Sequence, residues 1–465
     1  MLVVTLPSSA ARHPLRFVQK VMEMGAQVLE IRGDITPLVE IFDCPLPILV
    51  SPRKSMKLDV IAQLQPSYID LEMDEELDGI KGPVIIRSYH HHEFTPSLDK
   101  LKEIAENLIA QKGEIIKIAT TIREYADLVT LDRLQKSLPS NQQNIILGMG
   151  DKAHLSRMTS PWRNAFTYTF LDGTDKAATG QLPLSVYRKM AINQDQKKGK
   201  TVAPYMFGTI GAQQVTASLS PLIHNTLYSL HEYNGVFSIF PTQDFDEAWD
   251  ALTQIGVNGF SITAPWKRKV IDRLSRLDFL AERLQSVNTA IKEGDEWVGY
   301  NTDMHGLIAG YPFLSQCKRI AIIGSGGVVP AVIGACEDRN KGCRIEVFAR
   351  NAAALAELAD LHQIHTFPLD RLHAAEFDCV ICTVTEDIPV VLPQTNWGHF
   401  AIDLRYGKKT KFLMTAKDRG YVCHDGLPML IEQALKQFEI MTSIAPSQED
   451  KEKVEAIISS DKRLR

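Results

Sequence analysis

The sequence predicts an α/β protein that begins with a (β/α)8 barrel of the TIM-barrel class and continues with a two-domain α/β unit containing a Rossmann-type domain. Three observations lead to this prediction. Residues 1–195 alternate short apolar runs with helix-length amphipathic stretches. A polar segment at residues 193–200 interrupts the alternation, which restarts at Tyr205. Further on, a glycine-rich turn at residues 324–327 links an apolar run to another helix-length stretch.

Eight apolar runs in the first part of the chain are the candidate strands. The clearest helical stretches between them are residues 98–110 and 125–138. Since strands that alternate with helices form parallel β/α units, eight such units predict a closed barrel. The candidate strands are residues 2–6, 28–31, 48–50, 68–71, 84–86, 115–119, 145–149 and 167–171.

The composition is that of an ordinary globular protein with small-molecule partners. Of the 465 residues 45% are hydrophobic and 23% charged, and the net charge is -5, so there is no basic excess for nucleic acid or an anionic membrane. No window approaches the roughly 18 unbroken apolar residues of a membrane span. The chain begins with a short apolar run and no basic segment, so we expect a cytoplasmic protein.

The cysteines indicate neither disulfides nor a metal site. There are seven cysteines, which is an odd number, and they are scattered along the chain. Cys379 and Cys382 have redox or zinc-like spacing, but they lie in an apolar run and no second pair follows at zinc spacing. We expect both to be buried structural residues and assign no metal.

Polar residues occur where a barrel collects its catalytic side chains, at the C-terminal ends of the strands. Lys117 lies inside the sixth apolar run, where burial should lower its pKa and favour the free amine that Schiff-base chemistry requires. The others are Glu30 and Arg32 at the end of the second strand, Arg53 after the third, Glu72 at the end of the fourth, and Ser88 to His92 after the fifth.

Both reactive side chains also have a plainer interpretation. Lys117 could be structural, its stem crossing the barrel to pair with Glu30 or Glu72. Three adjacent histidines cannot all face one point, so residues 90–92 could be solvated surface residues or a metal site, and at most one need be catalytic. His90, the nearest to the strand end, is our candidate.

These residues resemble type I 3-dehydroquinate dehydratase, a (β/α)8-barrel family that dehydrates 3-dehydroquinate through an imine on lysine. The resemblance spans almost all of residues 1–195. It implies that Lys117 forms the imine and that His90 takes the neighbouring proton and then protonates the departing hydroxyl. It rests on Glu30-Ile31-Arg32, Ser88-Tyr89-His90 with Thr95-Pro96, Lys117-Ile118-Ala119, Ser156-Arg157 and Gly180-Gln181.

The same resemblance assigns substrate contacts. Glu30, Arg32 and Arg53 would hold the ring hydroxyls, Arg157 would face the carboxylate with its planar fork, and Gln181 would close the site. The chain departs from the family pattern in two places. Ala177 stands where a serine is usual, and residues 55–57 replace the usual Glu-Gly-Gly stretch.

The downstream glycine turn predicts a dinucleotide site. Residues 318–330 read as a strand, a tight turn and the start of a helix, and Gly324, Ser325, Gly326, Gly327 and Val328 form the turn. A plain strand-helix turn is the alternative. The next strand ends at Arg350, where an NAD enzyme would place an acid, so we expect NADP.

Five ordered motifs in residues 205–445 together resemble shikimate dehydrogenase. By that resemblance Lys267 and Asp303 form the catalytic pair, although Lys267 could also be a solvated member of the basic cluster 267–269. The motifs are Ser218-Leu219-Ser220-Pro221 with His224-Asn225, residues 261–267, Val287-Asn288-Thr289, residues 299–303, and Asp403 to Tyr406 with Gly426 to Gln433.

The family pattern also assigns binding residues in this half. Ser218 and Ser220 would bind the substrate carboxylate. Thr263, Asn288 and Gln433 would contact ring hydroxyls, Tyr406 the substrate region, and Leu404 and Gly426 the cofactor. Two positions depart from the pattern: Ser261 stands for an asparagine, and Ala354 replaces a second arginine of the cofactor motif, which weakens the preference for NADP over NAD.

We therefore expect five segments. They are a dehydratase barrel at residues 1–195, a substrate-binding domain at 204–310, a Rossmann-like NADP domain at 311–424, a helix at 425–445 that returns to the substrate domain, and a charged tail at 446–465. The tail is expected to be a solvated helix or a frayed end.

The two resemblances fit one pathway, because the product of the first reaction, 3-dehydroshikimate, is the substrate of the second. The resulting hypothesis is a bifunctional enzyme that makes shikimate from 3-dehydroquinate with NADPH. Two alternatives stay open: a quinate or shikimate dehydrogenase with an inactive barrel, and a ligand-sensing regulator without turnover. Oligomeric state and channelling between the sites are not predicted.

Overall fold

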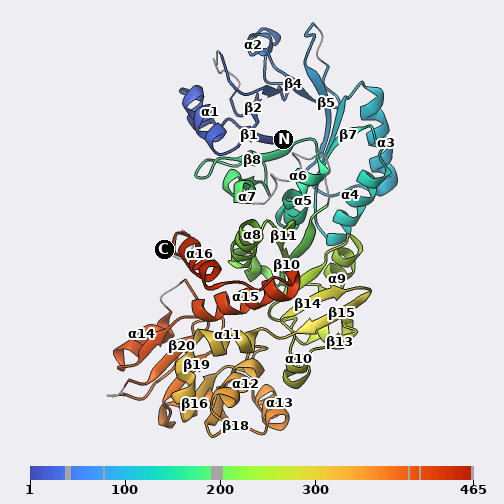
Figure 1. Cartoon of the computed structure of the whole chain (residues 1–465). Coiled ribbons are helices and arrows are strands. Elements are labelled where there is room, and N and C mark those ends of the chain that lie inside the picture. The colour runs from blue at the N-terminus through green and yellow to red at the C-terminus, as the bar shows by residue number, and fades with distance from the viewer. Residues whose placement is uncertain (37–42, 77–78, 190–202, 396–397, 408–409, 462–465) are drawn as a thin grey trace. The chain divides into compact units, whose positions relative to one another are not determined.

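The computed structural model describes residues 1–36, 43–76, 79–189, 203–395, 398–407 and 410–461 (Figure 1). The expected connection at residues 193–200 lies outside the described residues. The chain divides into two compact units. The first contains Met1–Phe207 and His231–Val257, and the second contains Gly208–Leu230 and Asn258–Arg465.

The first unit is built on a curled parallel sheet of barrel type. Its strand order is β7-β6-β5-β4-β3-β2-β1-β8-β9, which confirms the eight predicted strands in barrel order. The strands are apolar runs because both of their faces are covered. They are β1 (Leu2–Thr5), β2 (Val28–Arg32), β3 (Ile48–Ser51), β4 (Tyr68–Glu72), β5 (Val84–His91), β6 (Ile115–Thr121), β7 (Gln143–Met149), β8 (Thr167–Phe170) and β9 (Leu182–Pro183).

A side-chain amide joins β7 to the start of β8. Asn164 accepts a hydrogen bond from the backbone N–H of Ile146 at 3.0 Å and donates one to the carbonyl of the same residue at 3.1 Å. Next to it, the backbone N–H of Ala165 donates to the carbonyl of Asn144 at 2.9 Å. Asn164 therefore satisfies β7 backbone groups as a neighbouring strand would.

Capped amphipathic helices cover the outer side of the sheet. Ser97 caps α3 (Leu98–Ala110), and a capping box of Glu124 and Asp127 begins α4 (Tyr125–Ser137), so both predicted helices are confirmed. Figure 1 shows α3 and α4 beside strands β5 to β7. The other helices of the barrel are α1 (Pro14–Glu23), α2 (Leu58–Gln63), α5 (His154–Met158), α6 (Ser160–Arg163) and α7 (Leu184–Lys189).

The first unit also includes β11 (Gly235–Pro241) and α9 (Phe245–Gln254), which pack against α5 and α4. The hydroxyl of Tyr125 donates to the carbonyl of Pro241 at 3.1 Å. His154 makes a 2.8 Å hydrogen bond with the hydroxyl of Ser238. Burial lowers the pKa of His154 to about 4, so its ring is neutral.

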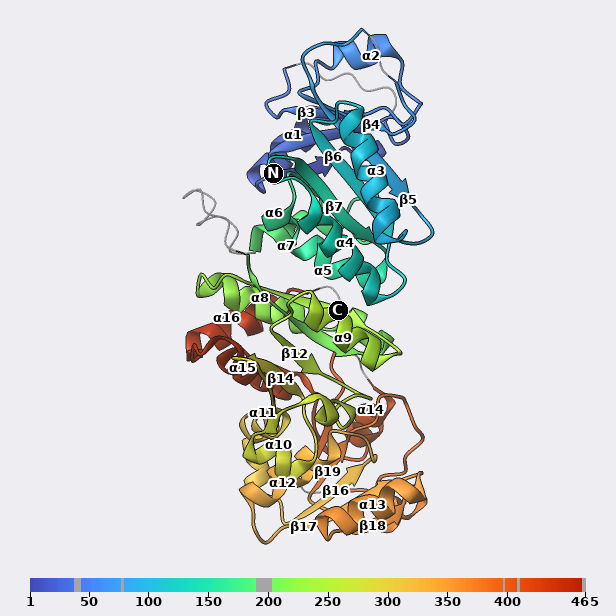
Figure 2. The same ribbon diagram turned by 90° about the vertical axis from the view of Figure 1, so that its right-hand side faces the viewer.

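The second unit contains a parallel sheet of Rossmann type (Figure 2). Its order is β18-β17-β16-β19-β20-β21, which in chain order is the 3-2-1-4-5-6 arrangement of doubly wound folds. Its elements are β16 (Arg319–Ile323), α12 (Val329–Arg339), β17 (Arg344–Ala349), α13 (Ala352–His362), β18 (His365–Pro368), β19 (Cys379–Cys382), β20 (Phe400–Asp403), α14 (Lys411–Asp418) and β21 (Val422–His424).

A second set of strands in this unit runs in the order β10-β12-β14-β15-β13. The long helix α15 packs against α11, α8 and β14, so the segment after the Rossmann-type sheet returns to these elements. Their bounds are β10 (Tyr205–Gly211), α8 (Ser220–Leu230), β12 (Gly259–Ile262), β13 (Arg276–Leu277), α10 (Phe279–Leu284), β14 (Thr289–Glu293), β15 (Glu296–Tyr300), α11 (Asp303–Gly310) and α15 (Leu427–Thr442).

The tail was expected to be a solvated helix or a frayed end; it is a helix, but one face of it is packed rather than solvated. Residues 448–459 form α16 (Gln448–Ser459), which begins with a capping box of Ser447 and Asp450 and packs against α8 and α15. Val454 and Ile458, one turn apart, are both buried. The charged composition concealed this narrow apolar face.

All seven cysteines are free thiols. Cys379 and Cys382 are buried on β19, in hydrophobic clusters on its two faces, as the apolar run predicted. In the parts of the chain that the structure describes, none of the helices combines the length and the apolar character needed to cross a bilayer.

Candidate active sites

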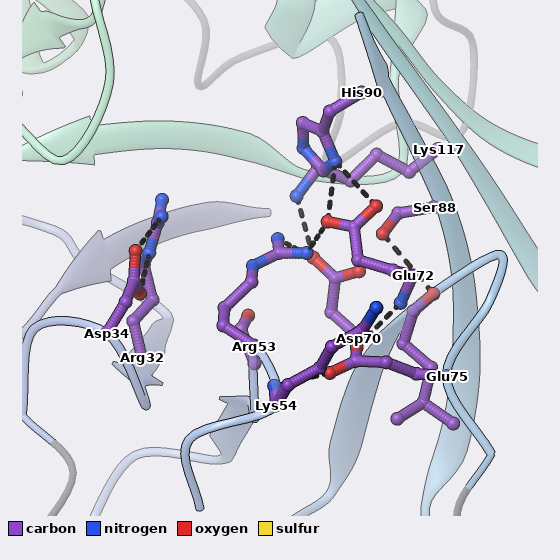
Figure 3. Close-up of polar contacts among 12 residues, drawn as sticks. Arg32, Asp34, Arg53, Lys54, Asp70, Glu72, Glu75, Ser88, His90 and Lys117 are labelled. Carbon is purple, nitrogen blue, oxygen red and sulfur yellow. Dashed lines mark hydrogen bonds and ion pairs between the residues drawn. The ribbon is translucent and has the colours of Figure 1, made fainter.

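Lys117 lies on β6 inside the barrel, paired with Asp70 of β4 (Figure 3). Its Nζ donates to Asp70 Oδ2 at 2.7 Å, and both side chains are buried. Burial lowers the pKa of Lys117, and the negative charge of Asp70 only partly opposes this effect. Burial alone would raise the pKa of Asp70, but Lys117 and Arg53 hold it well below its usual range. The partner of Lys117 is thus neither Glu30 nor Glu72.

His90 is oriented by a carboxylate. Its Nδ1 lies 2.8 Å from Glu72 Oε1, and Figure 3 shows the ring near the Lys117 side chain. A carboxylate at Nδ1 favours a proton on that nitrogen and leaves Nε2 free to accept one. Burial lowers the pKa of His90 more than Glu72 raises it, so the ring is neutral near pH 7.

The other two histidines have different surroundings. His92 stacks on His90 with ring centres 6.1 Å apart, and His91 contacts Phe94 at 4.1 Å. Within the described ranges, no group of histidine, cysteine, aspartate or glutamate is placed to hold a metal ion.

Arg53 connects the carboxylates of the lysine and the histidine. Its guanidinium pairs with Asp70 at 3.1 Å and also with Glu72. Arg32, which also ends near the mouth of the barrel, pairs instead with Asp34 at 2.7 Å and donates to the carbonyl of Ala177 at 3.4 Å. Of the two arginines predicted to hold ring hydroxyls, only Arg53 belongs to this hydrogen-bonded cluster.

Four buried polar atoms of barrel residues lack protein partners among the described residues. They are Asp70 Oδ1, Nε of Arg87, Nε of Arg157 and the hydroxyl of Tyr168. Burial lowers the pKa of Arg157 to about 10, still cationic near neutral pH. Lys117 Nζ lies 4.4 Å from the centre of the Tyr168 ring. Buried polar groups are costly without a partner, so these atoms are available to hydrogen-bond a bound molecule.

The remaining predicted residues of the barrel are held by short contacts. Glu30 is buried and accepts hydrogen bonds from Thr5 at 2.5 Å and from Ser51 at 2.9 Å. Gln181 is buried and accepts from the backbone N–H groups of Ala177 at 3.0 Å and Ala178 at 3.3 Å. The loop that contains Ala177 is therefore fixed through its backbone.

A second lysine–carboxylate pair lies in the second unit. Lys267 Nζ donates to Asp303 Oδ2 at 2.5 Å, and only 12% of the lysine side chain is exposed, so it is not a solvated member of the basic cluster. Asp303 is the first residue of α11. Its other oxygen accepts from Asn288 Nδ2 at 2.9 Å. Asn288 also donates to Thr302 Oγ1 at 2.9 Å, which fixes the orientation of the amide.

Helix α15 contacts Asn288 and its neighbours with two glutamines one turn apart. Gln433 Oε1 accepts from Asn288 Nδ2 at 3.5 Å and from Thr302 Oγ1 at 3.5 Å. Gln437 Nε2 donates to Ser261 Oγ at 3.2 Å and Thr289 Oγ1 at 2.9 Å, and also to the carbonyl of Asn288. The helix thus holds both the side chain and the backbone of Asn288.

The remaining predicted substrate residues lie in the same unit. Ser220 is the first residue of α8, and its N–H donates to Ser218 Oγ at 3.1 Å. Thr263 follows β12, and its N–H donates to the carbonyl of Ile210 at 3.1 Å. Tyr406 follows β20 and is half-buried.

The glycine turn opens a pocket of about 440 Å³ at the carboxyl end of β16. Gly324 has a φ of +121°, and a β carbon there would overlap Thr383, so only glycine fits. A β carbon at Gly326 would meet open space, which leaves its backbone approachable. The pocket is lined by Ile323, Gly324, Ser325, Phe348, Ala349, Arg350, Asn351, Leu369, Val384 and Ile388.

The turn also adjoins the lysine of the second site. The carbonyl of Gly327 accepts from Ser286 at 2.9 Å, and a β carbon there would lie 3.6 Å from the side chain of Lys267. Val328 is the N-cap of α12. Gly426 precedes α15 and packs so closely on the carbonyl of Leu404 that a β carbon would overlap it. The pocket, the helix start and Arg350 fit an anionic dinucleotide.

Sequence reasoning missed Asp70, Thr302 and Gln437. Asp70 had a usable signal, because it is an acid inside an apolar run that predicts a buried strand, as Lys117 is a base inside another. Gln437 had none, since an amide in a helix is ordinary and its partners are far away in the chain.

Comparison with known families divides the chain in the same way. Residues 2–196 match the family described as type I 3-dehydroquinase. Residues 210–290 match the family described as shikimate dehydrogenase substrate binding domain.

Curated relatives cover one or both parts. The chain is 26% identical to the bifunctional 3-dehydroquinate dehydratase/shikimate dehydrogenase, chloroplastic, of Arabidopsis thaliana, over 92% of this chain and 80% of the relative. It is 27% identical to the shikimate biosynthesis protein AroDE of Chlamydia muridarum, over 83% and 80%. It is 31% identical to the shikimate dehydrogenase (NADP(+)) of a Nostoc species, over 50% and 90%.

Proposed function

Because the chain belongs to the shikimate dehydrogenase family and carries a type I 3-dehydroquinase domain ahead of that part, we propose that it converts 3-dehydroquinate to shikimate in two steps. The observation that carries the proposal is the presence of two separate lysine sites in one chain. Lys117 has Asp70 and His90 beside it, and Lys267 has Asp303. We assign the dehydratase to residues 1–195, and the substrate and NADP domains of the dehydrogenase to residues 204–310 and 311–424.

The first reaction begins with nucleophilic attack by Lys117. The lowered pKa of the buried lysine favours the free amine, whose Nζ attacks the carbonyl carbon of 3-dehydroquinate. Loss of the carbonyl oxygen as water leaves an iminium ion on Lys117. Asp70, which stays ionised, accepts a hydrogen bond from the resting lysine and balances the positive charge of the iminium.

His90 then moves the proton. Its free Nε2 takes a proton from the carbon next to the iminium carbon, and the electron pair of that C–H bond is delocalised to the nitrogen. The resulting enamine expels the hydroxyl group one carbon further on, and the imidazolium of His90 protonates it to water. Hydrolysis of the new iminium releases 3-dehydroshikimate and restores Lys117. Glu72 keeps the His90 ring oriented throughout.

Five side chains would bind the substrate in the barrel. Arg157, whose Nε has no partner among the described residues, would bind the carboxylate. Glu30, Arg32 and Arg53 would contact the ring hydroxyls. Gln181 would close the site, through the loop whose backbone it already holds. The usual serine at position 177 is not needed for that loop contact, because the backbone N–H makes it.

The second reaction would use Lys267 as the proton donor. NADPH bound at the glycine turn supplies the hydride for this chemistry. Lys267 would donate a proton to the carbonyl oxygen of 3-dehydroshikimate, and Asp303 holds its ammonium in place. Asn288, Thr263 and Gln433 would contact ring hydroxyls. Ser218 and Ser220 would bind the carboxylate, and Tyr406 the substrate region.

The cofactor pocket supports NADP as the dinucleotide. Gly324, Ser325, Gly326, Gly327 and Val328 would hold the pyrophosphate at the start of α12. Arg350 lines the pocket after β17 and would pair with a 2'-phosphate. Leu404 and Gly426 would border the nicotinamide side.

Trapping the imine on Lys117 tests the first half of the proposal. Borohydride added with 3-dehydroquinate should leave a reduced adduct, which peptide mass spectrometry would place on Lys117. Lys117→Ala protein is the control. Absence of an adduct in active dehydrogenase would favour the alternative of an inactive barrel. Tight ligand binding without turnover at either site would favour a sensor.

A further inference from the structure

The loop that carries Arg53 has an unfavourable backbone. Arg53 and Lys54, which follow β3 after Pro52, both have positive φ values, 51° and 57°. Two consecutive residues with a β carbon rarely adopt the left-handed conformation unless neighbouring groups hold them there. The stretch after this arginine, residues 55–57, also lacks a carboxylate of its own.

A buried glutamate from the next loop holds this backbone. Glu75 follows β4 and is only 7% exposed. One oxygen of its carboxylate accepts from the N–H of Lys54 at 2.6 Å, and the other accepts from the N–H of Glu72 at 2.9 Å (Figure 3). Arg87 also holds this turn, because its guanidinium donates to the carbonyl of Glu75 at 2.5 Å. Lys54 and Asp74 form an exposed ion pair beside this bridge.

The carboxylate of Glu75 therefore bridges the backbones of the two segments that carry Arg53 and Glu72. Arg53 pairs with Asp70 and Glu72, the carboxylates that hold Lys117 and His90. Among the described residues, the Glu75 carboxylate contacts these two backbone N–H groups and none of the proposed reacting groups. We propose that Glu75 is a positioning residue of the dehydratase: it holds Arg53 in the left-handed loop and so keeps Glu72 aligned on His90. This inference rests on the proposed dehydratase function.

Replacement of Glu75 should affect one activity of the chain and spare the other. In Glu75→Ala and Glu75→Gln proteins we expect kcat for 3-dehydroquinate to fall about 10-fold or more, because a small displacement of catalytic groups costs this much or more. The acidic limb of the pH profile of kcat should also move, because the Glu72 carboxylate raises the pKa of His90 against the larger, lowering effect of burial. Reduction of 3-dehydroshikimate by the same proteins should stay at the wild-type rate and reports correct folding.

Two matched variants separate positioning from a general effect of charge. Glu76→Gln removes an exposed carboxylate from the adjacent position, and Asp74→Asn removes the exposed partner of Lys54. Both should keep wild-type dehydratase parameters. Lys54→Gly makes the left-handed conformation acceptable, so adding it to Glu75→Ala should restore much of the lost kcat.

Each outcome has a definite meaning. Rescue by Lys54→Gly together with a shifted pH profile supports the inference. Wild-type dehydratase parameters in Glu75→Ala, or equal loss of both activities in the two Glu75 variants, would overturn it, the second by showing a purely structural role. A wild-type protein without dehydratase activity would instead contradict the proposed function, and this inference would fall with it.

Discussion

Both proposed catalytic lysines have a buried carboxylate as their partner. Asp70 lies beside Lys117, where the reaction needs a free amine, and Asp303 lies beside Lys267, where it needs a proton donor. The difference is in the remaining neighbours. Arg53 adds positive charge next to Lys117, whereas Asn288 adds a neutral amide to Asp303. In the proposed mechanism the same pair of residue types therefore serves two different roles, with Lys117 as a nucleophilic amine and Lys267 as a proton donor.

At this scale, Glu72→Gln should change the pH dependence of dehydration. Glu72 raises the pKa of His90 against the larger, lowering effect of burial, so its removal lowers that pKa further. The base form then persists to lower pH, and the acidic limb of the kcat profile should move to lower pH. The plateau should fall by about 10²-fold or more because the ring loses its orientation. An unchanged limb would show that His90 is not the titrating base.

The residue scale also shows what a sequence can reveal about a site. Lys117 was predicted because a base in an apolar strand is unusual. Asp70 satisfies the same criterion and was overlooked in favour of the acids at strand ends. Glu75 could not have been predicted, because its role depends on backbone N–H groups of residues 54 and 72, and these carry no side-chain signature.

Single elements bring distant residues together in both units. Helix α15 brings Gln433 and Gln437 to Asn288, more than 140 positions earlier in the chain. In the barrel, Asn164 completes the hydrogen bonding of β7 next to β8.

Asn164→Ala should destabilise the barrel. The change leaves the N–H and the carbonyl of the buried Ile146 without these partners, which costs about 2–4 kcal/mol in the free energy of unfolding. Asn107→Ala, at an exposed position of α3, is the matched control and should be neutral within about 0.5 kcal/mol. Urea unfolding of the two variants measures the difference. Equal stability would mean that water replaces the amide at β7.

Elements were predicted well where one pattern dominated. Most of the barrel strands are apolar runs with buried residues on both faces, and α3 starts at the capping residue Ser97. The packing of the tail helix was not predicted, because its charges outnumber the two buried apolar residues, Val454 and Ile458. Strand β5 extends to His91, beyond the predicted end at residue 86, because its polar end faces the barrel.

At the scale of the whole molecule, buried neutral histidines should make stability depend on pH. Burial lowers the pKa of His154 to about 4 and that of His224 to about 3, below the usual value of about 6.5 in an unfolded chain. Between these values the unfolded chain binds more protons, so the stabilising contribution is complete above pH 6.5 and is lost as the pH falls through this window.

The His154 share of this effect can be measured. Between pH 7 and pH 5 its loss should lower the free energy of unfolding by about 2 kcal/mol. His154→Gln protein should lose stability over the same interval by correspondingly less than wild type. Urea unfolding at the two pH values gives the loss of unfolding free energy for each protein. Equal losses in the two proteins would mean that His154 is charged or accessible in the folded protein.

The sequence did not predict which segments of the chain belong to which compact unit. Residues 231–257 cluster with the barrel, although they follow the expected boundary near residue 200. Their association depends on contacts such as Tyr125 with Pro241, between positions 116 residues apart. Local patterns predict elements and motif order, but they carry no signal for pairings of this length.

In the proposed function the two lysine sites of this chain act in series. The most direct test mixes the purified protein with 3-dehydroquinate and NADPH and follows NADPH consumption, with Lys117→Ala protein and with 3-dehydroshikimate as the paired comparisons. We predict consumption from 3-dehydroquinate that vanishes in the variant, while reduction of 3-dehydroshikimate persists in both proteins. If the wild-type protein consumes NADPH with 3-dehydroshikimate alone, the proposed dehydratase activity of the barrel is contradicted. If it consumes NADPH with neither substrate, both proposed activities are contradicted.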